Sequence, residues 1–394
     1  MAINTDHPAG MIVRELDKIA NPSKESNLPP HDTKTESTSV KTAKPHALTS
    51  LLQPKEEINM SENTSPSRKR HTIAVYACGG LASNQIPKFH TAFADSPEGF
   101  ANIELYAVDT STSNFGGLPE GVKTYLIPNK DGSGQKRNLN ASASLERVKE
   151  IVRSFKPADL NIIISSASGG SGSVLSPLIT RELINSKLPT IVITVGDLTT
   201  RKFAENTIAT LRSFENFTRA PDARPIVMAY FENKGAASRK EVDNQILRLV
   251  AELSCLFSGQ NAELDSQDLY HWLNYHDVTD ARVQLANLTV LHGNETLDES
   301  VYGGPIAVAT IAEDIEKTDF AIPVDYQTIG LTAPGVYESS TVTHFVITDG
   351  YFDKVIARMD GQIKEIDEIK EARVQRESLI TSDSNVDNET GLVF

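Results

Sequence analysis

Cysteine, tryptophan and long apolar runs are scarce in this chain of 394 residues. The two cysteines, Cys78 and Cys255, provide no disulfide framework, so a reducing compartment is the simplest interpretation. No apolar stretch is long enough to span a membrane, and the N-terminus lacks the basic-then-apolar pattern of a secretory signal. We therefore expect a cytoplasmic protein that has no membrane partner.

An excess of basic residues is also lacking. The formal net charge is −14 at pH 7, whereas a general nucleic-acid-binding protein would carry a basic surface. Direct binding of nucleic acid is therefore not expected.

Aromatic residues are almost absent from residues 1–70, which are rich in Ser, Thr, Pro, Asn, Lys and Glu. Such a composition cannot bury enough apolar surface to offset the entropy lost on ordering. We predict a disordered N-terminal extension over 1–70. The other end of the chain, 379–394, is predicted to be an acidic tail that closes on three apolar residues.

Between these ends, short β-branched strands alternate with amphipathic helices. This order predicts an α/β fold with a doubly wound, mostly parallel sheet over 71–237. A central helix is expected over 238–258, because apolar residues recur there at helical spacing. A smaller α+β second (activation) domain is expected over 259–350, followed by a long C-terminal helix over 351–378.

Polar or glycine-bearing turns follow five of the predicted strands. They are Gly79–Gly80, Asp109, the loop 132–138, the loop 168–173 and Gly196–Asp197. In an open parallel sheet the ligand binds at the carboxyl ends of the strands. The sequence therefore predicts one binding site built from these five turns.

The loop "SGGSGS", Ser168 to Ser173, separates a buried strand from a helix. A flexible linker is the usual interpretation of a Gly/Ser run, but these flanks favour a phosphate site at a helix N-terminus. No lysine follows the glycines as in a Walker A loop, and the loop comes too late for a dinucleotide fingerprint. The esterase motif G-x-S-x-G does not fit either, because Ser173 stands where its last glycine should be.

Taken in order, the motifs from about residue 71 onward resemble the tubulin/FtsZ superfamily of GTPases, and within it the phage tubulins. "SGGSGS" stands at the position of the tubulin signature loop, and "GGLASNQI" at that of the first phosphate loop. "EVDNQIL" is similar to the purine-contacting start of the central helix. "ELDSQDL" is similar to the acidic synergy loop, although Glu263 replaces the asparagine of FtsZ.

The resemblance implies that 71–237 is a GTP-binding domain. It also implies that GTP or GDP, with Mg²⁺, is sandwiched between two subunits. Its implied contacts are Gly79, Gly80, Asn84, Asp109, Gly134, Asn138, Ser168, Gly169, Gly170, Ser171, Gly172, Ser173, Asn206, Arg239, Asp243 and Asn244.

Several of these residues have a specific implied role and an ordinary alternative. Asp109 would reach Mg²⁺ through water, or it is only a turn aspartate. The loop 132–138 would sense the γ-phosphate, or it is a solvated turn. Asn206 would lie on the ribose side. Asp243 and Asn244 would bind the guanine edge, with a solvated helix start as the alternative.

Arg239 occupies the place of the aromatic residue that stacks on guanine in FtsZ. A guanidinium plane can stack on a base as well. The stacking residue of this chain therefore stays open.

Asp265 and Asp268 are the implied catalytic residues, which would enter the neighbouring subunit's site and orient the attacking water. Their spacing alone favours a plainer role, because aspartates at a helix start stabilise any helix by capping.

Two functional classes remain. The first is a GTPase that polymerises with itself into dynamic cytoskeletal filaments, its C-terminal tail docking on the adjoining subunit. By resemblance, such filaments would form a spindle that positions phage DNA in the cytoplasm of an infected bacterium. The alternative is a free-standing nucleotide-binding enzyme whose active site is complete in one subunit.

Overall fold

The computed structural model describes residues 69–128, 131–235, 238–336 and 342–374, together with Asp387 and Glu389. Most of the predicted N-terminal extension and acidic tail lies outside these residues. Within them, no helix is both long and apolar enough to cross a membrane.

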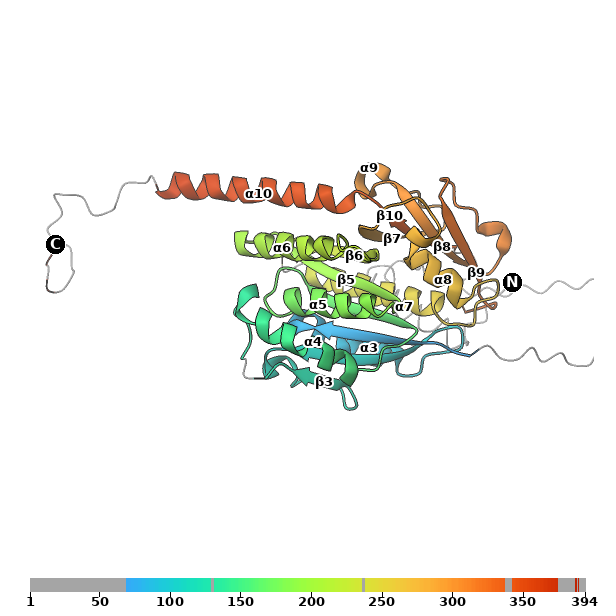
Figure 1. The fold of residues 1–394 in the computed structure, drawn as a ribbon, viewed down its shortest axis with the longest axis horizontal. Coiled ribbons are helices and arrows are strands. Elements are labelled where there is room, and N and C mark those ends of the chain that lie inside the picture. Colours follow the sequence, from blue (N-terminus) through green and yellow to red (C-terminus); the bar gives the residue numbers. More distant parts are fainter. Residues whose placement is uncertain are drawn as a thin grey trace, which may run out of the picture.

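Ten strands form one sheet in the order β3-β2-β1-β4-β5-β6-β7-β10-β8-β9 (Figure 1). The first six are β1 (Thr72–Cys78), β2 (Asn102–Asp109), β3 (Lys123–Leu126), β4 (Leu160–Ser166), β5 (Thr190–Asp197) and β6 (Ile226–Asn233). Every pairing among these six is parallel. The prediction of a doubly wound, mostly parallel sheet is confirmed.

The second part of the sheet is mostly antiparallel. It comprises β7 (Leu285–His292), β8 (Pro305–Ala312), β9 (Tyr326–Leu331) and β10 (Thr343–Thr348). β10 lies antiparallel between β7 and β8, and β9 is parallel to β8. β7 joins β6 in parallel over three residue pairs, so these strands continue the first sheet instead of forming a separate one.

Helices cover both faces of the sheet. One face carries α4 (Ala141–Ser154), α5 (Gly172–Asn185), α6 (Arg201–Phe217) and α10 (Tyr351–Val374). The other carries α3 (Ile86–Phe93), α7 (Arg239–Leu256) and α8 (Ser266–Leu273). Side chains alternate across the pleat, since Ile162 and Ile164 pack with α7 while Ile163 packs with α4 and α5.

Six shorter elements complete the described fold. They are α2 (Gly79–Ser83), α9 (Glu299–Tyr302) and the 3₁₀ turns η2 (Thr112–Asn114), η3 (Arg137–Leu139), η5 (Tyr275–Asp277) and η6 (Ile315–Lys317).

Helix α7 is the predicted central helix. It runs from the carboxyl ends of the parallel strands to their amino ends. Its 18 residues correspond to a length of about 27 Å at 1.5 Å per residue. Its first turn lies beside the carboxyl end of β1, where Arg239 and Cys78 line the same cavity. Just beyond its last turn, the Ser258 carbonyl accepts a hydrogen bond of 2.9 Å from the His71 N–H at the amino end of β1.

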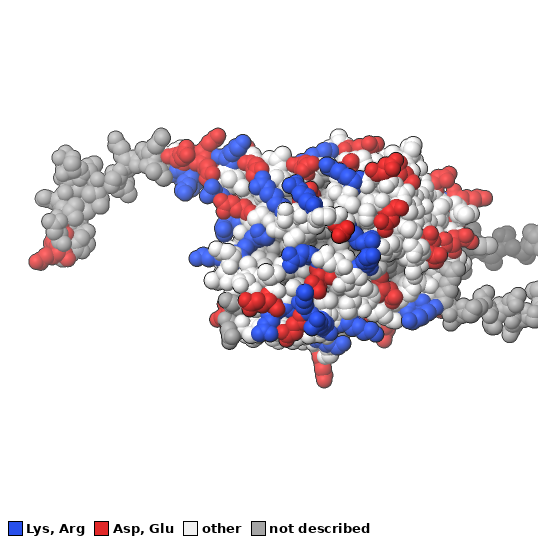
Figure 2. Space-filling model, in the orientation of Figure 1, with Lys and Arg blue, Asp and Glu red and all other residues white. Residues whose placement is uncertain are grey.

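Helix α10 lies beside α6 and runs past its end (Figure 1). Arg201 and Arg212 of α6 pair with Asp367 and Asp360 of α10 at 2.9 and 3.4 Å. The projecting end of α10 carries charges of both signs (Figure 2). This helix leads toward the C-terminal tail.

Candidate functional site

A cavity of about 640 Å³ opens at the carboxyl ends of the parallel strands. Its walls come from the loops that follow β1 to β6, so six separate stretches of sequence meet there. Each of the five predicted turns contributes at least one residue to the lining. The parallel topology therefore assembles the site, because it brings all these carboxyl ends to one edge.

The glycine loop between β4 and α5 packs too closely for side chains. A Cβ on Gly172 would lie 2.5 Å from the Cys78 carbonyl oxygen, and one on Gly170 would overlap Ser133. Gly79 has φ of +81°, and a Cβ there would lie 2.8 Å from the Gly172 nitrogen. The backbones of the first and fourth loops therefore approach each other directly.

The serines of this loop hold its backbone in place. Ser173 donates to the carbonyls of Gly169 and Gly170 at 2.7 and 3.0 Å, and it does not line the cavity. The Ser171 hydroxyl lies 2.6 Å from that of Thr110. Helix α5 begins at Gly172 without a side-chain cap. Its first N–H groups have no carbonyl within the helix, and together with the helix dipole they suit an anion such as a phosphate.

Asp109, at the end of β2, is buried and lines the cavity. Its carboxylate accepts from the Thr110 N–H and from the Asn114 amide, both at 2.6 Å. This is the turn role given above as the alternative.

Asp131 lines the same cavity as Asp109. Two carboxylates beside a phosphate loop fit a Mg²⁺ ion that keeps most of its waters. Among the residues that the structure describes, no cluster of three His, Cys, Asp or Glu side chains is placed to hold a metal by itself.

Part of the predicted γ-phosphate loop, 132–138, lines the cavity, beginning with Gly132. Ser133 and Gln135 line the cavity, whereas Gly134 and Asn138 are exposed and do not. Next in the loop, Arg137 turns inward and donates to the Ser173 carbonyl and the Ser213 hydroxyl, both at 3.2 Å. Burial lowers the pKa of Arg137.

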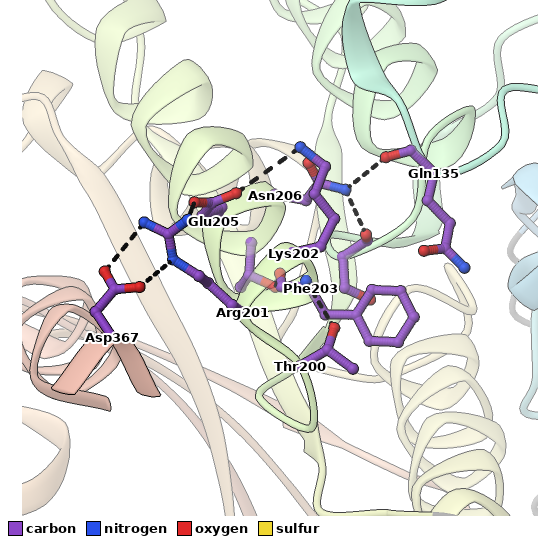
Figure 3. A network of polar contacts seen from close by, with 10 residues as sticks. Gln135, Thr200, Arg201, Lys202, Phe203, Glu205, Asn206 and Asp367 are labelled. Atoms are coloured by element: carbon purple, nitrogen blue, oxygen red, sulfur yellow. Dashed lines mark hydrogen bonds and ion pairs between the residues drawn. The ribbon is translucent and has the colours of Figure 1, made fainter. Parts of the chain in front are cut away.

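Asn206 lies behind the cavity wall. Its side-chain amide donates to the carbonyls of Gln135 and Ser168 at 3.0 and 2.9 Å (Figure 3). It therefore ties the γ-phosphate loop to the glycine loop, and it is not part of the cavity lining. One turn earlier, Phe203 does line the cavity. On the other side of α6, Arg201 pairs with Asp367 (Figure 3).

The start of α7 closes the far side of the cavity. Arg239 and Asp243 line it, and Asn244 does not. The Asp243 carboxylate accepts from the Gln85 amide and from Lys88 Nζ, the latter at 2.8 Å. Neither partner was predicted, because both precede Asp243 by more than 150 residues.

Asp265 and Asp268 lie at the opposite end of α7 from this cavity. They form a capping box on α8, in which Asp265 accepts from the Gln267 and Asp268 N–H groups and Asp268 accepts from the Asp265 N–H. The capping role is thus present in the structure. Burial, together with these two carboxylates, raises the pKa of Tyr326 to about 12.

Asp265 borders a second cavity, of about 380 Å³, with Lys69 and His71. Neither aspartate lines the first cavity. The predicted phosphate site and the predicted acidic pair therefore occupy opposite edges of one subunit.

Comparison with known proteins agrees with this architecture. The family model described as phage tubulin-like protein, C-terminal domain, matches residues 264–349. A phage tubulin-like protein of Pseudomonas phage phiKZ is 24% identical over 263 residues, 67% of this chain and 79% of the relative. Another, of Pseudomonas phage 201phi2-1, is also 24% identical over 294 residues, 73% of this chain and 91% of the relative.

Two solved structures match 82% of this chain and 99% of their own. A TubZ protofilament of bacteriophage PhiKZ has a TM-score of 0.68 at 23% identity. The phage tubulin PhuZ with GDP has a TM-score of 0.69 at 22% identity.

The fold is therefore that of the tubulin-like proteins. The amino-acid sequence of the chain is similar to those of phage tubulin-like proteins, and its fold is similar to those of the solved PhuZ and TubZ structures. The resemblance stated from the sequence is confirmed.

Proposed function

We propose that this protein is a tubulin-like GTPase that polymerises into dynamic filaments and completes GTP hydrolysis across the subunit interface. One observation carries the proposal. The phosphate-type loop and the acidic pair lie at opposite ends of α7, a helix about 27 Å long, so one subunit's aspartates do not line its own cavity. In a head-to-tail polymer the acidic pair of each subunit would meet the cavity of the next.

The cavity's chemistry supports a guanine nucleotide. The first turn of α5 would bind the phosphates through backbone N–H groups. At the other end of the cavity, Asp243 offers the two acceptors that match the N1–H and 2-amino donors of guanine. Adenine would present a ring acceptor to the same carboxylate, and this mismatch favours GTP over ATP.

Asp109 and Asp131 would hold Mg²⁺ through its waters, and the ion would neutralise charge on the phosphates. Asp268 and Asp265 would orient the attacking water from the neighbouring subunit. Capping does not compete with this role, because each carboxylate has about four lone-pair positions.

Polymer formation is tested by right-angle light scattering and sedimentation with GTP, GDP or ATP and Mg²⁺. We expect polymer with GTP and little with GDP or ATP. Equal assembly with all three nucleotides would overturn the proposal.

The cellular role rests on the phage relatives. We propose that the filaments form a spindle in the host cytoplasm that positions phage DNA. This is tested with a fluorescent fusion of the protein in infected cells. We expect phage DNA to be displaced from its usual place when the fusion carries a substitution that prevents assembly.

A free-standing enzyme remains the second candidate, because Asp109, Asp131 and Asp197 line the cavity of a single subunit. This candidate predicts a turnover rate per subunit that does not change with dilution.

A further inference from the structure

We propose that Lys88 is a positioning residue that determines guanine specificity by orienting the carboxylate of Asp243. The inference rests on the proposed function, since it concerns how the same cavity selects its base. It adds a residue that does not line the cavity and that the sequence motifs did not include.

The geometry begins with α3. Ile86, Phe89 and Phe93 are buried in the core shared with α7, which fixes the rotation of the short helix. Gln85, at its N-cap, and Lys88 are three residues apart, so both can face α7. Both side chains donate to Asp243, Gln85 to Oδ1 and Lys88 Nζ to Oδ2 at 2.8 Å.

Two donors on different oxygens fix the plane of a carboxylate. A single donor leaves it free to rotate about its last side-chain bond. Guanine presents two parallel donors, N1–H and the 2-amino group, and both oxygens must lie in the base plane to accept them. Each oxygen has a second lone pair, so Asp243 can bind the base while keeping Gln85 and Lys88.

Gln85 is less suited than Lys88 to hold this plane by itself. It is almost fully buried, and its Oε1 atom has no hydrogen-bond partner. Gln85 also lines the cavity, so a bound ligand that offers an acceptor would compete with Asp243 for the amide N–H groups of Gln85. Lys88 lies outside the cavity lining. It can therefore donate to Asp243 Oδ2 even if a bound ligand reorients the Gln85 side chain.

The ion pair is partly exposed, with 39% of the Lys88 and 29% of the Asp243 side chain accessible. Water screens such a pair, so its direct contribution to stability is small. We therefore expect its removal to affect ligand discrimination more than folding.

The test compares GTP with ITP, whose hypoxanthine base lacks the 2-amino group. Each nucleotide displaces a fluorescent GDP analogue from the full chain at equilibrium. The parent should prefer GTP by roughly ten- to a hundredfold, the usual effect of one hydrogen bond to a charged acceptor. Lys88→Met keeps the aliphatic stem but loses the charge, and it should reduce this preference by about three- to tenfold.

Two further variants separate positioning from a structural role. Lys88→Arg retains a donor cation and should restore most of the preference. Arg147→Met removes an ion pair to Glu150 that is 2.8 Å long and lies on the surface of α4, and it should leave the preference unchanged.

An unchanged ITP-to-GTP ratio in Lys88→Met would overturn the positioning role, whatever happens to the absolute affinities. A parent that binds GTP and ATP equally would instead overturn the proposed function, and the inference with it.

Discussion

Aspartates lie near both ends of helix α7, but their carboxylates are held in different ways. At the cavity end, Asp243 is fixed by Gln85 and Lys88, which are 158 and 155 residues away in the chain. At the other end, Asp265 and Asp268 are fixed by backbone N–H groups within three residues. The contacts of Asp243 therefore depend on the tertiary fold, whereas the carboxylates of Asp265 and Asp268 accept from backbone N–H groups of their own helix turn.

This difference suits the proposed roles. A base-binding carboxylate needs a prearranged partner within its own subunit. A carboxylate that acts on a neighbouring subunit must be rigid before that neighbour arrives, and a capping box adds rigidity through adjacent backbone groups.

The largest effect is expected at the cavity end, in the glycine loop. Gly172→Val should abolish nucleotide binding, because a Cβ there would meet the Cys78 carbonyl at 2.5 Å. The side chain would also occupy space beside the first turn of α5, where the phosphates should bind. The measurement is titration with a fluorescent GDP analogue, with circular dichroism as the check on folding.

Gly116→Val is the matched control, since a Cβ there has nothing within 4 Å. Binding by the Gly172 variant at the parent's affinity would contradict the assignment of the phosphate loop.

The next largest effect is expected at the acidic end. Asp268→Asn keeps an oxygen acceptor for the Asp265 N–H, so the cap should persist while the charge is lost. Nucleotide binding and filament growth should be retained, and phosphate release should slow by roughly 100-fold or more, as for the loss of other transition-state contacts. Sedimentation and phosphate release are measured on the same samples.

The comparison between the two ends would fail if Asp268→Asn hydrolysed GTP at the parent's rate. It would also fail if the variant lost nucleotide binding, since that result would place Asp268 in its own subunit's site.

The sequence predicted the local motifs at the two ends of α7, but not the contacts that depend on tertiary packing. The glycine loop and the capping box are local patterns of four to six residues, and their geometry follows from backbone requirements. Lys88 and Phe203 are ordinary residues of amphipathic helices, and only the tertiary packing brings Phe203 to the cavity and Lys88 to Asp243. No local signal distinguishes them from other polar or aromatic helix residues.

The resemblance implied that Asn206 lies on the ribose side, and in the structure its side-chain amide links two loop carbonyls. The residue was identified by its place in a motif, whereas its contacts depend on Gln135, 71 residues earlier. Similarly, Gly134 and Asn138 belong to the expected loop, but Gly132, Ser133 and Gln135 of that loop line the cavity instead.

The C-terminal tail, most of which lies outside the described residues, is a further predicted part of the contact between subunits. Deleting 380–394 should raise the critical concentration for assembly by about tenfold, equivalent to 1.4 kcal/mol per subunit, because the tail is proposed to dock on the adjoining subunit. Added salt should reproduce part of this loss by screening its carboxylates. The measurement is sedimented polymer against total protein, with GTP present.

Deleting 1–68 is the matched control, and it should leave assembly largely intact. If the chain without 380–394 assembles like the full chain, the tail is only a solvated end.

The smallest effect is expected from the cap itself. Asp265→Ala should lower the free energy of unfolding by about 1 kcal/mol, the usual loss for an N-cap aspartate. Asp265→Asn should lower it by much less, because the amide oxygen still accepts from the backbone. Urea unfolding of both variants checks this, and equal stability of the two would show that the capping hydrogen bonds contribute little.

The central claim is that one subunit's cavity is completed by another subunit's acidic pair. The most direct test is phosphate release per subunit across a wide range of protein concentration, with GTP and Mg²⁺ saturating. The account predicts almost no release below the concentration at which polymer first sediments, followed by a steep rise above it. A rate per subunit that stays constant on dilution would contradict the account and show that the active site is complete within one chain.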